Sequence, residues 1–203
     1  RYVDDIVLPG LAHGAVLHSP HAHARIKSID TSQAKAAPGV LLVLTGADAA
    51  ADKLGSYTAA MMPEDIGAPK GHRTHLPILQ PEKVRFVGDR VAFVVAETAG
   101  QARDAADMIE VEYDTLAAVG QIEEAAKDGA PKVWDDNPNG NTAFVLAFGD
   151  EKATDGAFAR AKHVVKLRTV NNRVTPVSME PRTAIGDYNA ADDFYTLYTS
   201  SQN

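Results

Sequence analysis

The sequence contains no cysteine among its 203 residues. A chain without thiols cannot form a disulfide, bind zinc or an iron–sulfur cluster through thiolates, or use a cysteine nucleophile. It also lacks the run of ~18 apolar residues that a membrane-spanning helix needs, and its first residues include Asp4 and Asp5 instead of the basic start of a secretory signal. These absences favour a soluble protein, which we expect to be cytoplasmic.

Nucleotide-binding and hydrolase signatures are missing as well. Neither G-x-x-x-x-G-K-[ST] nor G-x-G-x-x-G occurs, and no serine lies in a G-x-S-x-G turn. The formal net charge is −7, and residues 151–203 hold seven basic against six acidic residues, so the acidic excess lies in residues 1–150. An acidic surface repels phosphates, so we expect no nucleic-acid partner.

The composition is that of a globular protein, with 45% hydrophobic and 23% charged residues. The clearest pattern is a strand, a helix and a strand over 84–114, with the helix expected at 99–108. Thr98 and Gln101 match the T-x-x-Q capping box, in which each side chain bonds a backbone amide at the helix start. The residues expected to pack the helix against a core are Ala102, Ala105, Ala106 and Ile109.

Elements elsewhere in the chain indicate the α+β class. A domain boundary is expected in the polar stretch 119–141, which gives domains 1–135 and 142–203. Thr31 or Ser32 is suited to cap a helix, and 46–80 reads as a long irregular excursion. The other expected elements are buried strands at 11–18 and 40–44, a half-exposed strand at 24–29, helices at 31–37, 47–53, 121–127 and 155–161, and strands at 164–170, 182–188 and 194–199.

Two groups of side chains invite a chemical interpretation. Imidazole is a common metal ligand, and four histidines lie close together in the sequence, but no carboxylate follows them at a suitable spacing, so we favour structural hydrogen bonding. Glu110 and Glu112 share one side of a strand and could divide acid and base roles; a solvated strand face explains them as well, and we favour it. The four histidines are His13, His18, His21 and His23.

Three stretches resemble the large, molybdopterin-binding subunit of the xanthine dehydrogenase and aldehyde oxidase family, in particular its bacterial carbon-monoxide-dehydrogenase-like branch. They span nearly the whole chain, which makes chance similarity improbable. The stretches are Arg1-Tyr2-Val3-Asp4-Asp5 with Ser19-Pro20-His21-Ala22-His23-Ala24-Arg25-Ile26, then Lys83–Ala92 with Val111-Glu112-Tyr113-Asp114, and finally Met179-Glu180-Pro181-Arg182 with Thr199-Ser200-Ser201-Gln202-Asn203.

The resemblance implies a fold and a function. The fold is a hammerhead domain, a mixed sheet with packed helices, followed by the start of the first molybdopterin-binding domain. The function is that of a molybdenum hydroxylase, which oxidises or hydroxylates a small substrate with oxygen from water. Electrons would pass to a 2Fe-2S small subunit and an FAD medium subunit, in a dimer of heterotrimers. A chain without cysteine or a dinucleotide fingerprint fits this division of labour.

The resemblance also suggests roles for individual residues. In the family the glutamine of the Ser-Thr-Gln motif hydrogen-bonds an oxo ligand of molybdenum, and Gln202 occupies that place; the alternative is that Gln202 is an ordinary terminal residue. For Glu180 we favour a structural role, with Arg182 as partner. The Pro-His-Ala-His-Ala-Arg motif belongs to the scaffold. The chain departs from the family pattern at Asp89-Arg90, where Glu-Pro is expected after Gly88.

A rival interpretation keeps the hammerhead fold without catalysis. In this reading the chain is a binding or assembly module that docks a partner through residues 46–80. If the chain is instead the N-terminal fragment of a hydroxylase subunit, we expect it to bind no molybdenum and to be inactive alone. The catalytic glutamate and the residues that select the substrate would then lie beyond Asn203.

Overall fold

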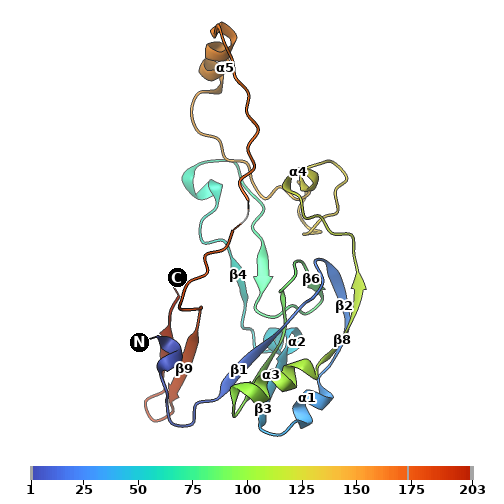
Figure 1. Cartoon of the computed structure of the whole chain (residues 1–203), viewed down its shortest axis with the longest axis vertical. Coiled ribbons are helices and arrows are strands. Elements are labelled where there is room, and N and C mark those ends of the chain that lie inside the picture. Colours follow the sequence, from blue (N-terminus) through green and yellow to red (C-terminus); the bar gives the residue numbers. More distant parts are fainter. Residues whose placement is uncertain (1, 173, 202–203) are drawn as a thin grey trace. The chain divides into compact units, whose positions relative to one another are not determined.

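The structure, a computed structural model, describes residues 2–172 and 174–201. The chain divides into two compact units, one of residues 12–148 and one that joins residues 1–11 to residues 149–203 (Figure 1). Helices and sheets occur in both parts of the sequence, which confirms the expected α+β class. In the residues described, no helix combines the length and the apolar character needed to cross a membrane.

An antiparallel sheet in the order β1-β7-β3 forms the first layer of unit 12–148. The central strand β7 is buried on both faces: Ala92 and Val94 belong to one apolar cluster and Val91 to another. The outer strands are less covered: Val43 of β3 is 4% exposed, whereas Leu41 and Leu42 are 59% and 47% exposed. The strand expected at 40–44 is present, but the expectation that it is buried was wrong for Leu41 and Leu42, because β3 lies at the edge of the sheet. The bounds are His13–His18 for β1, Val40–Thr45 for β3 and Arg90–Ala96 for β7.

A second antiparallel sheet has the order β6-β2-β8. The register of β2 shifts between Ile26 and Ser28, where a bulge interrupts the pairing with β8. Such a bulge changes which side of the strand faces the core. Ile26 and Ile29 consequently both pack against the apolar cluster, although they are three residues apart. The bounds are Ala24–Asp30 for β2, Lys83–Val84 for β6 and Glu110–Thr115 for β8.

Helix α3 (Ala99–Asp107) connects the two sheets, since β7 precedes it and β8 follows it. Its expected packing face is confirmed: Ala102, Ala105 and Ala106 are at most 5% exposed. The Thr98 hydroxyl accepts a bond from the Gln101 backbone amide at 3.2 Å, as the capping motif predicts. The other half of the motif differs, because the Thr98 hydroxyl donates to the Gln101 side-chain oxygen at 2.8 Å.

The remaining elements of this unit are short. Helix α1 begins where expected, but its first amide is bonded by Asp30, whose carboxylate accepts from the Ser32 backbone at 2.8 Å, and not by Thr31 or Ser32 side chains. The excursion 46–80 is partly ordered by an antiparallel pair, β4 with β5. The bounds are Ser32–Ala36 for α1, Gly46–Ala51 for α2, Ser56–Thr58 for β4, Pro63–Ile66 for the 3-10 helix η2, His75–Pro77 for β5 and Ile122–Ala125 for α4.

The other unit joins both ends of the sequence. It contains the 3-10 helix η1 (Val3–Asp5), helix α5 (Glu151–Arg160) and the antiparallel hairpin of β9 (Ala184–Asn189) and β10 (Phe194–Thr199). Helix α5 starts four residues before the expected position because the Asp150 carboxylate caps it, accepting from the Ala153 amide at 2.8 Å. The hairpin lies where the sequence predicted it.

The strand expected at 164–170 is not present, which corrects that prediction. The described residues of this segment form no strand, and Val165 and Leu167 are 91% and 83% exposed. A run of β-branched residues favours an extended chain, but a strand also needs a neighbour to accept its hydrogen bonds. No strand among the described residues pairs with this segment in a sheet.

Gly46 at the start of α2 is expected to tolerate no side chain. A Cβ there would lie 2.5 Å from the Pro81 nitrogen and 2.6 Å from the Gln80 carbonyl carbon, and backbone atoms cannot move aside cheaply. Gly46→Ala should therefore lower the free energy of unfolding by about 1–3 kcal/mol. Gly100 in α3 is the matched control, since nothing lies within 4 Å of its Cβ position.

Gly100→Ala should leave stability unchanged or raise it by about 0.5–1 kcal/mol, because alanine has the better helix propensity. Urea titrations of both variants would measure the two shifts. Equal stabilities for Gly46→Ala and the wild type would contradict the close approach of α2 to residues 80–81.

Candidate functional site

The residue singled out from the sequence, Gln202, lies outside the described residues, so the structure bears on its surroundings only through the chain that precedes it. That chain is the end of β10 and the two serines Ser200 and Ser201. The site is therefore built from the hydrogen bonds that hold this strand end.

Ser200 holds the strand end through both its backbone and its hydroxyl. The hydroxyl accepts from the Thr183 amide at 3.1 Å and donates to the Pro181 carbonyl at 3.0 Å. The Ser200 amide donates to the Thr183 carbonyl at 3.3 Å. One side chain thus fastens the segment before β9 to the end of β10. From the sequence, Ser200 was noted only as part of the Thr-Ser-Ser-Gln motif that contains Gln202, and no role was predicted for it.

Glu180 lies directly before this fastening and has a partner far away in the sequence. Its Oε1 accepts a hydrogen bond from the Val3 backbone amide at 2.9 Å. The side chain is half-buried, whereas Arg182, its expected partner, is exposed and forms no ion pair with it in the part of the chain described. A structural contact is therefore present, but with the N-terminal turn and not with Arg182.

The histidines have separate surroundings. His23 is 8% exposed and its Nδ1 lies 2.8 Å from the Ala117 carbonyl, while the His21 ring meets the Tyr113 ring edge to face at 4.7 Å. His13 and His18 lie at opposite ends of β1, opposite Ala96 and Arg90. The residues described contain no group of three histidines or acids arranged to hold a metal.

Glu110 and Glu112 lie on the exposed side of β8. The Glu112 carboxylate forms an ion pair with Lys27 on the neighbouring strand β2. The Lys27 hydrogen bond and positive charge lower the pKa of Glu112 below its ordinary value, which keeps the carboxylate ionised. A low pKa does not suit a general base or acid near neutral pH. The solvated strand face fits these observations better than a catalytic pair.

The turn at Gly88-Asp89 was expected from the sequence, but the burial of its carboxylate was not. Asp89 is fully buried, and its carboxylate accepts from the amides of Arg85 at 3.1 Å and Arg90 at 3.0 Å. Gly88 before it has φ of 90°, which only glycine adopts readily. The Ser19 amide and carbonyl bond Asp89 and Gly88, each at 2.8 Å. Proline could not donate as the Arg90 amide does, so the Asp-Arg pair forms its own compatible turn.

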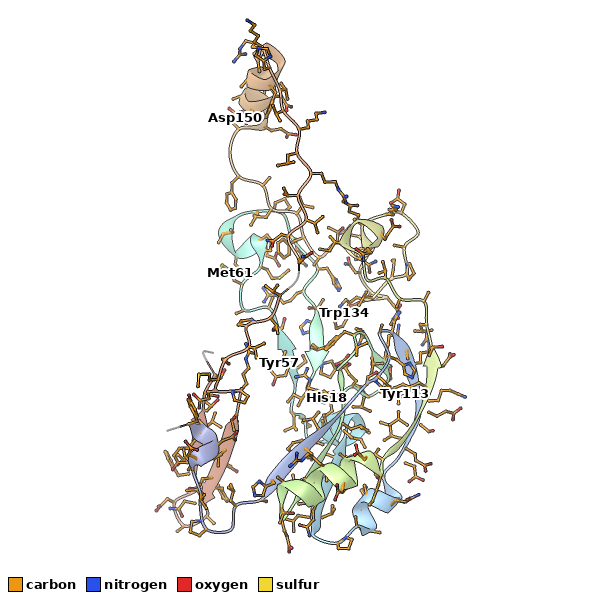
Figure 2. The ribbon with its side chains drawn as sticks, in the orientation of Figure 1. His18, Tyr57, Met61, Tyr113, Trp134 and Asp150 are labelled. Atoms are coloured by element: carbon orange, nitrogen blue, oxygen red, sulfur yellow. The ribbon has the colours of Figure 1, made fainter. Side chains whose placement is uncertain are left out.

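Charged side chains attach the loop 131–137 beside this turn. Lys83, with a side chain only 8% exposed, forms an ion pair with Asp135. The Arg85 guanidinium lies 4.0 Å from the centre of the Trp134 ring and donates to the Gln80 side-chain oxygen at 3.2 Å. Figure 2 labels Trp134 within this part of the structure. The contacts fix the loop and pair Asp135 with Lys83, while the second acid of the loop, Asp136, lies 3.6 Å from the His72 Nε2 and is 75% exposed.

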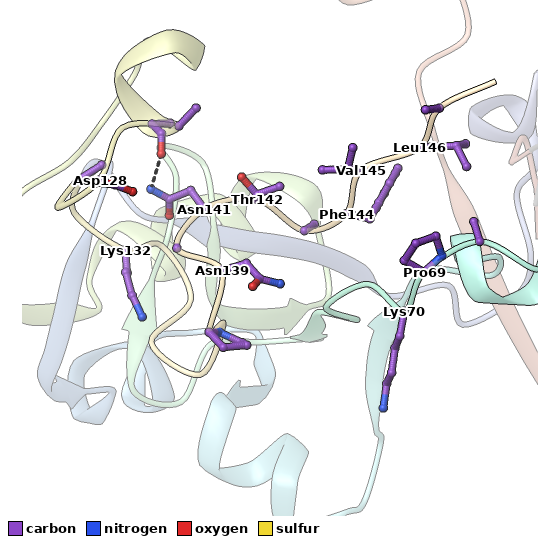
Figure 3. A pocket seen from close by; sticks show the side chains of 18 of the residues that line it. Pro69, Lys70, Asp128, Lys132, Asn139, Asn141, Thr142, Phe144, Val145 and Leu146 are labelled. Atoms are coloured by element: carbon purple, nitrogen blue, oxygen red, sulfur yellow. Dashed lines mark hydrogen bonds between the residues drawn. The ribbon is translucent and has the colours of Figure 1, made fainter. Parts of the chain in front are cut away.

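A hollow of about 1090 Å³ lies among the segments 66–70, 125–132 and 138–148 (Figure 3). Asn141 spans its wall: its amide nitrogen donates to the carbonyls of Ala125 at 3.1 Å and Pro131 at 3.0 Å. Phe144, Val145 and Leu146 supply apolar surface. Asp128 is the single acid of the lining and no histidine joins it, so the hollow offers no acid–base pair.

Comparison with known proteins assigns the fold and then the family. Residues 1–117 match the aldehyde oxidase and xanthine dehydrogenase a/b hammerhead domain, and residues 133–203 match a molybdopterin cofactor-binding domain. The first match covers more than half of the 203 residues. The chain has the hammerhead fold of molybdenum hydroxylase large subunits. It belongs to the aldehyde oxidase and xanthine dehydrogenase family.

Curated relatives from the same family align with the whole chain. It is 35% identical to the carbon monoxide dehydrogenase large chain of Afipia carboxidovorans, with 100% of this chain and 25% of the relative covered. It is 34% identical to the nicotine 6-hydroxylase large subunit of Paenarthrobacter nicotinovorans, with 100% and 24% covered. The chain thus spans about a quarter of the length of these relatives.

Solved structures share the fold as well. Quinoline 2-oxidoreductase from Pseudomonas putida 86 aligns with a TM-score of 0.82 and 38% identity, over 100% of this chain and 25% of that one. The Cu,Mo-CO dehydrogenase aligns with a TM-score of 0.84 and 35% identity, over 98% and 25%. The resemblance inferred from the sequence motifs is confirmed at the level of the family.

Replacing the Asp89 carboxylate should lower the stability of the protein. Asp89→Ala would leave two amides of a buried turn without an acceptor, so we expect the free energy of unfolding to fall by about 2–4 kcal/mol. Asp89→Asn keeps one acceptor oxygen and should lose less. The control Asp104→Ala removes an exposed acid from α3 and should change stability by less than about 0.5 kcal/mol. Chemical denaturation would measure all three, and a harmless Asp89→Ala would contradict the role of the turn.

Proposed function

We propose that this chain is the hammerhead domain and the beginning of the first molybdopterin-binding domain of a molybdenum hydroxylase large subunit. The domains comprise residues 1–135 and 142–203, a division supported by the two family matches to 1–117 and 133–203. The complete subunit oxidises or hydroxylates a small substrate with oxygen derived from water.

The observation that carries this proposal is the match of residues 133–203 to a molybdopterin cofactor-binding domain. This segment contains Glu180, Thr183 and Ser200, whose hydrogen bonds hold the strand end that leads to Gln202. A segment whose strand end is fastened by hydrogen bonds suits the support of a cofactor better than the direct ligation of a metal.

The residues present fit the molybdenum–molybdopterin cofactor in this supporting role. When bound, the cofactor supplies the centre at which oxygen is transferred. Gln202 would donate a side-chain N–H to an oxo ligand, which orients the complex and tunes it without a bond to the metal. The described residues offer no cluster of metal ligands that would compete with this arrangement. Ser200 contributes by holding the strand end through Pro181 and Thr183.

Electron transfer requires partners in this proposal. The chain has no cysteine, so it cannot hold an iron–sulfur cluster through thiolates. An iron–sulfur small subunit and an FAD medium subunit would accept the electrons, and the complete enzyme would be a dimer of such heterotrimers. The cytoplasm is the expected compartment, and the chain taken alone would bind no cofactor.

The range of substrates follows from the relatives. Their names specify carbon monoxide, nicotine, quinoline and aldehyde, which are all small carbon compounds. The residues that choose among them would lie outside this chain, so the proposal is limited to a small oxidisable carbon compound.

The role of Gln202 can be tested in the complete subunit purified with its partners. The wild type should contain molybdenum, measured by mass spectrometry, and should oxidise at least one member of a panel of carbon monoxide, aldehydes, purines and N-heteroaromatic compounds. Gln202→Ala should keep the metal and lose about 10–100-fold in kcat, because it removes one hydrogen-bond donor to the cofactor.

Gln33→Ala, which changes an exposed glutamine of α1, is the control and should leave kcat unchanged. A wild-type enzyme without molybdenum would contradict the proposed function and favour a non-catalytic binding module. A Gln202→Ala enzyme with full molybdenum and full kcat would contradict the role of Gln202 alone.

A further inference from the structure

The N-terminal turn η1 begins with an amide that the turn itself cannot bond. The first amides of any helix lack partners within it. The Asp5 carboxylate satisfies the Tyr2 amide at 2.7 Å, and Glu180 satisfies the Val3 amide at 2.9 Å. The capping group of this turn is thus supplied by a residue 177 positions away in the sequence. An ionised acceptor makes this a stronger bond than one between neutral groups.

The same segment that caps η1 is bonded to the end of β10. Pro181 and Thr183 follow Glu180 within three residues, and both bond the Ser200 hydroxyl, at 3.0 and 3.1 Å. The Thr183 carbonyl also accepts from the Ser200 amide at 3.3 Å. Val3 is thus bonded to Glu180, and the backbone of residues 180–183 connects this contact to the bonds with Ser200. Gln202 follows two residues later in the sequence.

Burial supports a shared face in this unit. Thr183 and Ile185 at the start of the hairpin, and Thr196, Tyr198 and Ser200 at its end, are half-buried, whereas the residues next to the turn are exposed. In the N-terminal segment Val3, Ile6 and Leu8 are half-buried, whereas Tyr2 and Val7 are exposed. The polar contacts accordingly lie where the hairpin has apolar cover.

We infer that Glu180 and Ser200 are positioning residues that tie the N-terminal turn to the strand end leading to Gln202, so that η1 helps to fix where Gln202 is presented. This inference rests on the proposed function, because it gives Gln202 the cofactor as its target. Neither Glu180 nor Ser200 needs to touch the cofactor in this role. The N-terminal turn, which matches the family's hammerhead segment by sequence, would act on the cofactor-binding segment through one carboxylate.

Val3→Pro is the sharpest variant. Proline removes the single N–H that Glu180 accepts, and it suits the first position of a helix. The preceding residue must be extended, and Tyr2 already has φ −100° and ψ 167°. Val3→Ala is the matched control, because it shortens the same side chain and keeps the N–H.

Amide hydrogen exchange in the complete enzyme would measure whether the bond between Val3 and Glu180 stabilises the segments around Thr183 and Ser200. In Val3→Pro we expect the amides of Thr183 and Ser200 to exchange about tenfold faster than in Val3→Ala, as the loss of a charge-assisted bond implies. Glu180→Ala should have the same effect, and Glu180→Gln, which keeps an acceptor oxygen, should restore most of the protection. Asp187→Ala, an exposed acid on β9, should leave these amides unchanged.

A second readout concerns the cofactor. The electron paramagnetic resonance spectrum of the molybdenum centre should change in Val3→Pro and Glu180→Ala, and it should match the wild type in Val3→Ala and Glu180→Gln. A Glu180→Ala protein that fails to fold would leave Val3→Pro to decide the matter.

Unchanged exchange at Thr183 and Ser200 in Val3→Pro would overturn the inference, and so would faster exchange with an unchanged molybdenum spectrum. A wild-type enzyme purified without molybdenum would overturn the proposed function and, with it, the role of the tie. The exchange coupling would still be measurable in that protein, so the two failures can be told apart.

Discussion

The burial of β7 on both of its faces is the constraint on which the larger unit depends. Ala92 and Val94 pack with α3 on one side, and Val91 packs with Ala24 and Val84 of the other sheet. A strand covered on both faces is apolar on both faces. In this three-stranded sheet its two neighbours lie at the edges, and the edge strand β3 keeps exposed leucines.

Buried polar side chains hold the turns that adjoin this core. The turn before β7 buries the Asp89 carboxylate, and the turn remains stable because two backbone amides satisfy the charge. Ser19 is bonded to the same turn, and a scaffold role for the adjoining Pro-His-Ala-His-Ala-Arg motif would agree with these bonds. In the other unit, a carboxylate and a hydroxyl perform a comparable task around the N-terminal turn and the end of β10. In both units buried or half-buried polar side chains hold turns in place.

Much of the fold could be predicted from periodicity and capping residues. Helix α3, its alanine face and the β9–β10 hairpin follow from local patterns, because a 3.6-residue period or a turn between two alternating runs carries its own signal. Burial was harder to foresee: an apolar strand reads the same at an edge as in the centre of a sheet. The segment 164–170 shows the same limit, since its residues favour a strand but no described strand pairs with it in a sheet.

For the candidate site, too, some features could be predicted from the sequence and others could not. By itself the sequence determined the family, because its motifs can be recognised in the order of the residues. The sequence also singled out Gln202, Glu180 and the histidines for which a structural role was expected. Only the tertiary structure decided that Glu180 meets the Val3 amide and not Arg182, and that Ser200 is bonded to Pro181 and Thr183. The physical reason is that a hydrogen bond depends on distance and direction in space. Residues separated by 177 positions leave no sign of such a bond in the order of the amino acids.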